Sequence, residues 1–240
     1  MFDLHSHVIY QVDDGARSLD EALELVRSDV MQGADRICAT PHYSVDHPLE
    51  PELVHQRLVE LRARAQGTGL DVEIFPGNEV LYFDSMAECL GEGQILTLGE
   101  SRFVLIEFYP GDSYSRILTA VRKLRRAGYR PVIAHAERFR SLRERGLNGA
   151  ISEGAYIQVS TEPLGKSGIS GLLDGESRFI RNALKHHEVH FLGTDMHRMD
   201  RRPPELSDAV RWVKHHVNHP YAEDLLWKNG SRLLEDRDFL

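Results

Sequence analysis

The chain has 240 residues, enough for one α/β domain, and 41% of them are hydrophobic, which supplies a core and excludes a disordered chain. Its formal net charge of −8 disfavours extended nucleic-acid binding, so no nucleic acid is expected as a partner. Two cysteines without a disulfide framework, no apolar run near the ~20 residues of a membrane helix and no secretory signal predict a single cytoplasmic domain over residues 1–240, without membrane insertion.

Short apolar runs alternate with longer amphipathic stretches along the chain. The first run, Phe2–His5, is followed by a helical pattern that begins with a capping box at Ser18 and ends at Gly33. We expect further strands at Arg36–Thr40, Val72–Phe75, Phe103–Phe108, Pro131–Ala134, Tyr156–Val159 and Val189–Leu192. We expect further helices at about Pro51–Gln66, Ser115–Ala127, Arg178–His187, Pro204–His216 and Tyr221–Trp227. Seven strands that alternate with helices predict a parallel sheet, open or closed into a barrel, and the glycine-rich stretch Gly165–Gly175 predicts a mobile loop.

The first strand ends in His5-Ser6-His7. Residues two apart in a strand point to the same face, so His5 and His7 can bind one ion. Two incidental histidines in an extended segment would give the same pattern. The residues at the ends of the other predicted strands distinguish a metal site from coincidence.

Nearly every predicted strand ends in, or leads directly to, a potential metal ligand. The candidates are His5, His7, Asp14, His42, Glu79, Glu107, His135, Asp195 and His197. Parallel strands bring their carboxyl ends to one edge of the sheet, which is where sites assemble. Glu107 alone would fit a buried salt bridge, but polar residues at six strand ends favour a shared site. Spacing does not choose between Asp14 and its neighbour Asp13.

The candidate set holds five histidines and four carboxylates, too many for one ion and suited to two or three. Imidazole and carboxylate ligands without thiolate indicate Mn, Fe or Zn. Three divalent ions (+6) against four carboxylates (−4) leave a net charge of +2. That charge would attract a phosphate dianion and stabilise a hydroxide, so the set predicts phosphoester hydrolysis.

Arginines follow two of the candidate ligands. They are Arg138 and Arg140 after His135, and Arg198, Arg201 and Arg202 after His197. Because a guanidinium can bind phosphate in a bidentate fashion, we expect Arg138 and Arg202 to contact the substrate phosphate. The alternative for all five arginines is a solvated, salt-bridged rim.

Two other phosphate-handling motifs are not supported. A cysteine-dependent phosphatase needs an arginine six residues after its cysteine, but Ser44 follows Cys38 at that distance and Ile95 follows Cys89. The stretch Gly165-Lys166-Ser167 lacks the leading glycine of a P-loop. Thiolate catalysis of that type is therefore excluded, and a nucleotide cradle has no support.

The motifs together resemble the polymerase and histidinol phosphatase (PHP) superfamily, most closely its bacterial manganese-dependent protein-tyrosine phosphatases that regulate capsule and exopolysaccharide synthesis. The resemblance covers essentially the whole chain. It is carried by Asp3-Leu4-His5-Ser6-His7, Val12-Asp13-Asp14-Gly15-Ala16, Ala39-Thr40-Pro41-His42, Gly77-Asn78-Glu79, Ile106-Glu107-Phe108, His135-Ala136-Glu137-Arg138-Phe139, Thr194-Asp195-Met196-His197 and Arg202-Pro203-Pro204. This chain departs from the family where Arg198 replaces a frequent asparagine and where Ala136 replaces a frequent proline.

The resemblance implies a distorted, TIM-like (β/α)7 barrel with three divalent ions, most often Mn, at the C-terminal ends of the strands. It implies that one ion is held by His5, His7, Glu79 and Asp195, a second by Glu79, Glu107 and His135, and a third by Asp14, His42 and His197. It implies that Asp14, rather than Asp13, is a metal ligand. It also implies that Arg138 and Arg202 bind the substrate phosphate.

The implied activity is hydrolysis of phosphotyrosine by a metal-activated hydroxide. The implied substrate is a phosphotyrosine protein, the tyrosine-rich tail of a cognate bacterial tyrosine kinase. Two alternatives remain open: a phosphoesterase on the same centre that acts on a small metabolite such as histidinol phosphate or on a nucleic-acid end, and a non-catalytic metal-binding module. The sequence identifies neither a general acid for the leaving group nor an oligomeric state.

Overall fold

The computed structural model describes the backbone of residues 1–240 and all side chains except those at 169, 170 and 172. Its strands are β1 (Phe2–Ser6), β2 (Arg36–Ala39), β3 (His42–Tyr43), β4 (Glu73–Pro76), β5 (Glu79–Leu81), β6 (Phe103–Glu107), β7 (Arg130–Ile133), β8 (Tyr156–Ser160) and β9 (Phe191–Gly193). Every strand pair is parallel, as the alternation of strands and helices predicts.

Seven of the nine strands are the predicted ones, and β3 and β5 are additional. The second predicted strand, Arg36–Thr40, is β2, and the chain resumes as β3 after Pro41, which has no N–H to donate. The third predicted strand, Val72–Phe75, is β4, and the chain resumes as β5 after Gly77-Asn78. β2 pairs with β4 and β3 with β5, and the Glu79 N–H donates to the Pro41 carbonyl at 3.1 Å.

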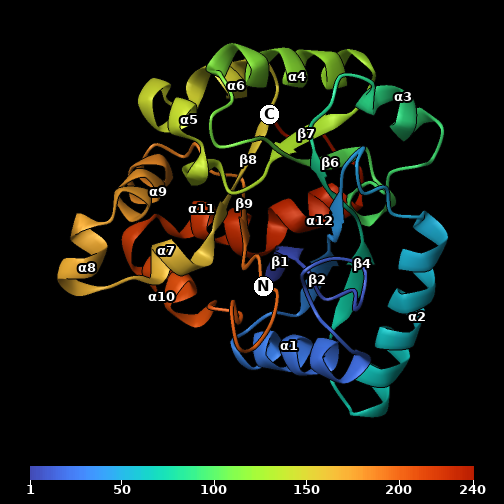
Figure 1. Ribbon diagram of the computed structural model, residues 1–240. Coiled ribbons are helices and arrows are strands. Elements are labelled where there is room, and N and C mark those ends of the chain that lie inside the picture. The colour runs from blue at the N-terminus through green and yellow to red at the C-terminus, as the bar shows by residue number, and fades with distance from the viewer.

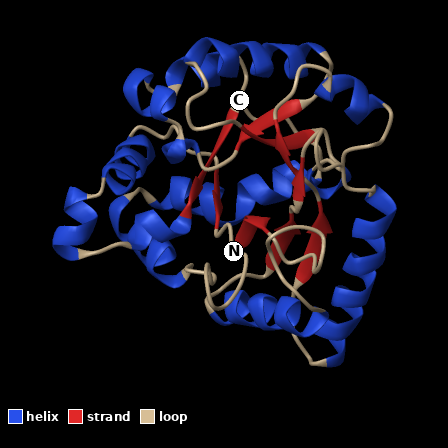
Figure 2. Cartoon of the chain, viewed as in Figure 1, coloured by secondary structure: helices blue, strands red, loops and turns tan.

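The strands close into a barrel. One sheet runs β1-β2-β4 and the other β3-β5-β6-β7-β8-β9. The first strand then meets the chain after β9, where the Asp195 N–H donates to the His5 carbonyl and the His7 N–H to the Met196 carbonyl, both at 2.8 Å. The predicted (β/α)7 barrel is confirmed, and Figure 2 shows most of its helices around the strands, with a helical segment of the C-terminal part seen across the middle of the ring.

The helices fill the connections and the C-terminal part of the chain. They are α1 (Leu19–Met31), α2 (Pro51–Gly67), α3 (Met86–Gly91), α4 (Tyr114–Arg126), α5 (Arg140–Arg145), α6 (Asn148–Ser152), α7 (Thr161–Gly165), α8 (Gly168–Leu173), α9 (Gly175–Lys185), α10 (Ser207–His216), α11 (His219–Glu223) and α12 (Asn229–Leu234), with 3-10 turns at Leu98–Glu100 and Ala136–Arg138 and a π-helical turn at Asp224–Lys228. In Figure 1, α2 lies beside β4, and α4 beside β7. None of the helices in the described part of the chain is long and apolar enough to cross a bilayer.

The C-terminal segment seals the barrel at the end where the strands begin. The Arg36 side chain donates to the Ser231 hydroxyl at 2.9 Å, and the Tyr156 hydroxyl donates to Asp238 at 2.6 Å. A cluster of apolar side chains from the barrel interior continues into Leu233 of α12. The polar candidates lie at the opposite end of the barrel, where the strands terminate.

Two predicted boundaries are wrong for identifiable reasons. The stretch Gly165–Gly175 is not a loop throughout, because α8 lies within it and Asp174 caps α9 by accepting from the Glu176 N–H at 3.1 Å. The last strand starts at Phe191 rather than Val189, because the Val189 N–H and carbonyl both bond to the Tyr221 hydroxyl.

Candidate metal centre

The floor of the centre is formed by the two histidines of the first strand. His5 and His7 are buried, and their Nε2 atoms lie 3.2 Å apart. Glu79 Oε2 lies 3.1 Å from His5 Nε2 and 3.3 Å from His7 Nε2, and Asp195 Oδ1 lies 3.5 and 3.4 Å from the same atoms. These four residues can offer ligand atoms within 4.8 Å of one another, which is the set expected around one ion.

Two glycines allow the first strand to approach the centre so closely. A Cβ on Gly193 of β9 would lie 2.6 Å from His5 Cβ and 2.9 Å from Gln158 Nε2. A Cβ on Gly15 would lie 2.3 Å from the His7 carbonyl oxygen. Larger residues at these two positions would displace the backbone that carries His5 and His7.

The remaining candidates surround Glu79. Its Oε1 lies 2.7 Å from His135 Nε2, and its Oε2 lies 3.1 Å from His42 Nδ1. Glu107 lies 3.6 Å from His135 and 3.7 Å from His42. Glu79 thus faces both the floor pair and the group of His42, Glu107 and His135, as a bridging ligand would.

The third group lies at the rim. Asp14 Oδ1 is 3.6 Å from His42 Nε2 and 3.4 Å from His197 Nε2. The His197 ring stacks on His7 with 3.9 Å between ring centroids. All nine candidates are therefore brought together at the C-terminal ends of the strands.

Two of the nine candidates have unusual backbone conformations. His135 has φ +30° and Asp195 has φ +53°, both in the left-handed region that non-glycine residues rarely adopt. Such strained residues persist where the surrounding structure holds them, and they concentrate at functional sites. Here the strain falls on residues that turn out of β7 and β9 toward the cluster.

The hydrogen-bond partners of the histidines fit a metal centre. The Nδ1 atoms of His7 and His197 bond to oxygens of Asp13 and Asp195 at 2.7 and 2.8 Å, and each ring's Nε2 faces the cluster. Glu79 Oε2 is buried and has no hydrogen-bond partner among the described residues, although three imidazole nitrogens lie within 3.3 Å. Convergent nitrogen lone pairs around carboxylate oxygens are the arrangement that a divalent ion completes.

The ionisation of the cluster also reflects its density of charge. Burial would raise the pKa of Glu79, but His5, His135 and His42 hold that pKa well below its usual range. Burial would lower the pKa of His135, but hydrogen bonds to Glu107 and Glu79 raise it to about 10. Without ions, the carboxylates therefore favour positive charge on His7, His42 and His135, whereas burial lowers the pKa of His197 to about 4. Divalent cations would supply such positive charge.

Both predicted phosphate-binding arginines reach the centre. Arg138 Nη2 donates to Asp195 Oδ2 at 2.6 Å, and Arg202 Nη1 donates to the same oxygen at 3.0 Å. Asp195 therefore points Oδ1 at the floor histidines and Oδ2 at the two guanidinium groups. Of the other arginines, Arg140 pairs with Glu144 at 2.7 Å, and Arg198 lies 3.4 Å from Asp200.

Asp13 and Gln158 support the centre, and the sequence did not reveal either role. Asp13 Oδ2 contacts His7 Nδ1 at 2.7 Å and accepts from the His42 N–H at 3.0 Å. Gln158 Oε1 lies 3.3 Å from His5 Nδ1 and accepts from the His135 N–H at 2.7 Å. The doubled aspartate Asp13-Asp14 was the one available signal, because one carboxylate can orient a ligand while the next faces the ion.

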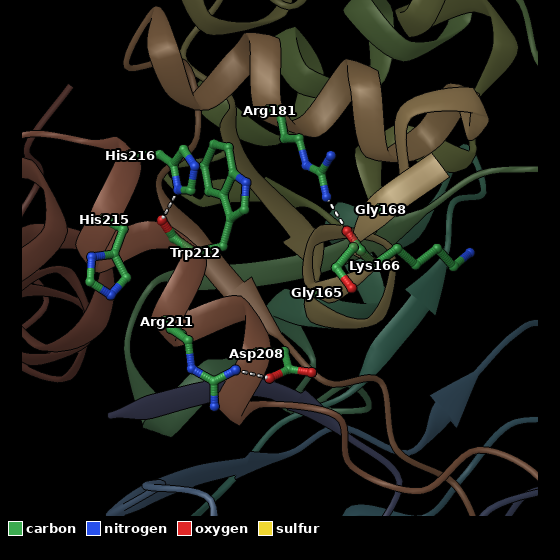
Figure 3. A pocket seen from close by; sticks show the side chains of 10 residues that line it. Gly165, Lys166, Gly168, Arg181, Asp208, Arg211, Trp212, His215 and His216 are labelled. Carbon is green, nitrogen blue, oxygen red and sulfur yellow. Dashed lines mark hydrogen bonds and ion pairs between the residues drawn. The ribbon is translucent and has the colours of Figure 1, made fainter. Parts of the chain in front are cut away.

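A hollow of about 490 Å³ lies away from the centre, between α7, α9 and α10 (Figure 3). Its cations have partners of their own: Arg211 pairs with Asp208 at 2.7 Å, and Lys166 with Asp174 at 2.9 Å. His216 stacks on Trp212 in the last turn of α10. This hollow contains none of the nine candidates and does not resemble a metal site.

Comparison with known proteins identifies relatives along the whole chain. The family model for capsular polysaccharide synthesis, CpsB/CapC, matches residues 1–235. The tyrosine-protein phosphatase CpsB of Streptococcus agalactiae is 31% identical over 242 residues, which cover 98% of this chain and 99% of that protein. The tyrosine-protein phosphatase YwqE of Bacillus subtilis is 31% identical over 243 residues, which cover 99% of this chain and 92% of that protein.

A solved structure agrees with these relatives. It comes from work on YwqE from Bacillus subtilis and CpsB from Streptococcus pneumoniae, described there as metal-dependent tyrosine phosphatases. It superposes on this chain with a TM-score of 0.90 at 27% identity, covering 100% of this chain and 96% of the other. The resemblance predicted from the motifs is thus confirmed, and the chain belongs to the CpsB/CapC family of capsular polysaccharide synthesis.

Proposed function

We propose that this chain is a metal-dependent protein-tyrosine phosphatase whose nine clustered ligands hold three divalent ions. The observation that carries the proposal is the position of Glu79, whose two oxygens face histidines of different groups beside two arginines. Full-length similarity to proteins named tyrosine-protein phosphatases supports the choice of substrate.

Each group of ligands has a distinct place. His5, His7 and Asp195 would hold one ion and His135 and Glu107 a second, with Glu79 available to both. Asp14, His42 and His197 would hold the third. When bound, the ions, which we take to be Mn with Fe or Zn as the other candidates, supply Lewis-acid charge and lower the pKa of water. Asp13 and Gln158 fix the tautomers of His7 and His5 so that Nε2 faces the ion.

Arg138 and Arg202 bind the substrate phosphate. Both guanidinium groups are anchored on Asp195 Oδ2 and have further N–H donors for phosphate oxygens. Because the anchor is itself a proposed metal ligand, phosphate on the arginines is held next to the ions. The donors neutralise the charge that develops on the phosphoryl oxygens during hydrolysis.

The leaving group needs little help from the protein. A phenol has a pKa near 10, well below that of an alkyl alcohol, so tyrosine departs without a strong general acid. We assign no residue to that role. The physiological substrate we propose is the phosphotyrosine-bearing tail of a bacterial tyrosine kinase in the cytoplasm, where it would control capsule or exopolysaccharide synthesis.

A side-by-side assay tests this function. Manganese-loaded protein is given a phosphotyrosine peptide, the matched phosphoserine peptide and histidinol phosphate, each with and without a chelator. The proposal predicts preferred turnover of phosphotyrosine, loss of activity with chelator and a large loss in His42→Ala. Equal or faster turnover of histidinol phosphate would overturn the tyrosine assignment, and activity that survives both metal removal and His42→Ala would overturn the metal mechanism.

A further inference from the structure

A hollow of about 530 Å³ opens beside the metal centre, between the loop after β1 and the loop that joins β3 to α2. Its walls are formed by Val12, Asp13, His42, Asp46, His47, Pro48 and Leu49. The volume is in the range of sites that bury a small ligand or one or two side chains. His42 belongs both to the centre and to the wall, so the hollow adjoins the centre.

The centre meets solvent on the side of this hollow. The His42 side chain is 38% exposed, whereas those of His5 and His135 are 0% and 5% exposed. Asp14, its neighbour at the rim, is 55% exposed. A substrate whose phosphate lies on the ions therefore passes His42, and the rest of that substrate lies near the hollow.

The wall is part apolar and part polar, and a tight turn holds it. Val12, Pro48 and Leu49 present hydrocarbon to the space. The His47 N–H donates to both the carbonyl and the hydroxyl of Ser44, at 3.2 and 3.1 Å, which fixes the loop. An aromatic ring buries much apolar area in such a space, and a preformed wall avoids the entropic cost of ordering it.

Asp46 gives the hollow a negative charge with no protein partner. It is exposed, and among the described residues no cation forms an ion pair with it. The arginines near the centre are already engaged: Arg138 and Arg202 contact Asp195, and Arg198 lies close to Asp200. The other carboxylate of the wall, Asp13, is already bonded to His7 at 2.7 Å, and no ion pair joins His47 to Asp46 in the described part of the chain. The hollow therefore offers apolar contact together with the unpaired carboxylate of Asp46, which matches an aromatic residue next to a cationic one.

We infer that this hollow binds the peptide around the phosphotyrosine, with the ring against Val12 and Pro48 and a neighbouring Lys or Arg paired with Asp46. The inference rests on the proposed function and specifies its substrate class, a phosphotyrosine flanked by a basic residue. Asp46 selects the substrate and takes no part in the chemistry.

Matched peptides test this selection. Manganese-loaded protein is given phosphotyrosine peptides that carry Arg or Glu at one position, placed in turn at the two residues before and the two after the phosphotyrosine, with kcat/KM as the readout. A charge pair at a solvent-exposed rim contributes about 1 kcal/mol, so at one of the positions we expect about a fivefold preference for Arg. The variant Asp46→Lys should invert that ratio.

The control is Asp71→Lys, an exposed aspartate just before β4, at the opposite end of the barrel. It should keep the preference of the unaltered protein. Hydrolysis of phosphotyrosine peptides with an Arg/Glu ratio near one, or a ratio that Asp46→Lys leaves unchanged, would overturn the inference while the proposed function stands. If the metal-loaded protein hydrolyses neither these peptides nor p-nitrophenyl phosphate, the proposed function itself fails.

Discussion

Asp13 illustrates how single residues set the chemistry of this centre. Its carboxylate contacts His7 Nδ1, accepts from the His42 N–H and also accepts from the Gly15 N–H at 2.9 Å. Three contacts from different parts of the chain fix its position, although the side chain is not among the nine candidate ligands. Its charge raises the pKa of His7 against the effect of burial, which shows how strongly it polarises that ring.

Asp13→Asn should weaken metal binding without removing a ligand. Losing the charge reduces the basicity of His7, and losses of partners of this kind typically cost 10- to 100-fold in metal affinity. We expect the Mn concentration for half-maximal activity to rise by about that factor, with most activity recovered at saturating Mn. Asp71→Asn serves as the control, and an unchanged Mn dependence would contradict the supporting role of Asp13.

Arg138→Lys should impair phosphate binding, because lysine replaces a planar fork with a point charge and loses the anchor on Asp195. A charge-assisted hydrogen bond contributes about 1.5–3 kcal/mol, so kcat/KM for a phosphotyrosine peptide should fall about 10- to 100-fold. Arg140 pairs with Glu144, so in the control variant Arg140→Lys the value of kcat/KM should fall less than twofold. Equal effects of the two substitutions would show that Arg138 does not contact the phosphate.

The elements show which parts of this fold the sequence determines locally. The seven strands and the long helices were predictable because each shows its own pattern of apolar residues, and α1 also has a cap in Ser18, which accepts from the Glu21 N–H. Helices of five or six residues, such as α5 to α8, are too short to show a period. The short strands β3 and β5, which follow Pro41 and Gly77-Asn78, were missed for the same reason.

The same distinction applies to the candidate site. The clustering of the nine candidates was predictable because they follow strand ends, and parallel strands bring those ends together. Gln158 was not, because its contact with His5 joins residues 153 positions apart and no local pattern marks it. The hollow beside His42 likewise depends on how two loops pack and left no signal in the sequence.

The C-terminal segment gives a prediction at the level of elements. Asp236 accepts from the Arg102 N–H at 2.9 Å and pairs with Arg130, whose side chain is 8% exposed. Asp236→Ala should lower the free energy of unfolding by about 1–2 kcal/mol, a modest value because Asp236 itself is partly exposed and screened. Urea denaturation measures the change, with the exposed Asp208→Ala as control, and equal effects would contradict this role of the segment.

The pH dependence of that contribution has a definite sign. Burial would raise the pKa of Asp236, but its contacts with Arg102 and Arg130 lower it below the usual value. The contribution is therefore fully present above the unfolded pKa of about 4 and is lost as the pH falls through the lower folded value. The difference between unaltered protein and Asp236→Ala should accordingly shrink in strong acid.

The whole molecule combines an acidic chain with a site for phosphate. The net charge of −8 would repel a phosphate dianion at long range, and four proposed carboxylate ligands add to that at the centre. Arg138 and Arg202 offset only part of this charge. Occupancy by divalent ions reverses the local sign, so the account requires that metal binding and phosphate binding depend on each other.

Anomalous diffraction from manganese-loaded crystals, recorded on both sides of the Mn edge, tests the central claim most directly. The account predicts peaks inside the cluster of nine residues, with His5 and His7 on one ion beside Glu79 and with His42 and His197 on another. Peaks at other places, or a manganese-replete crystal in which His5 and His7 contact no metal, would contradict it.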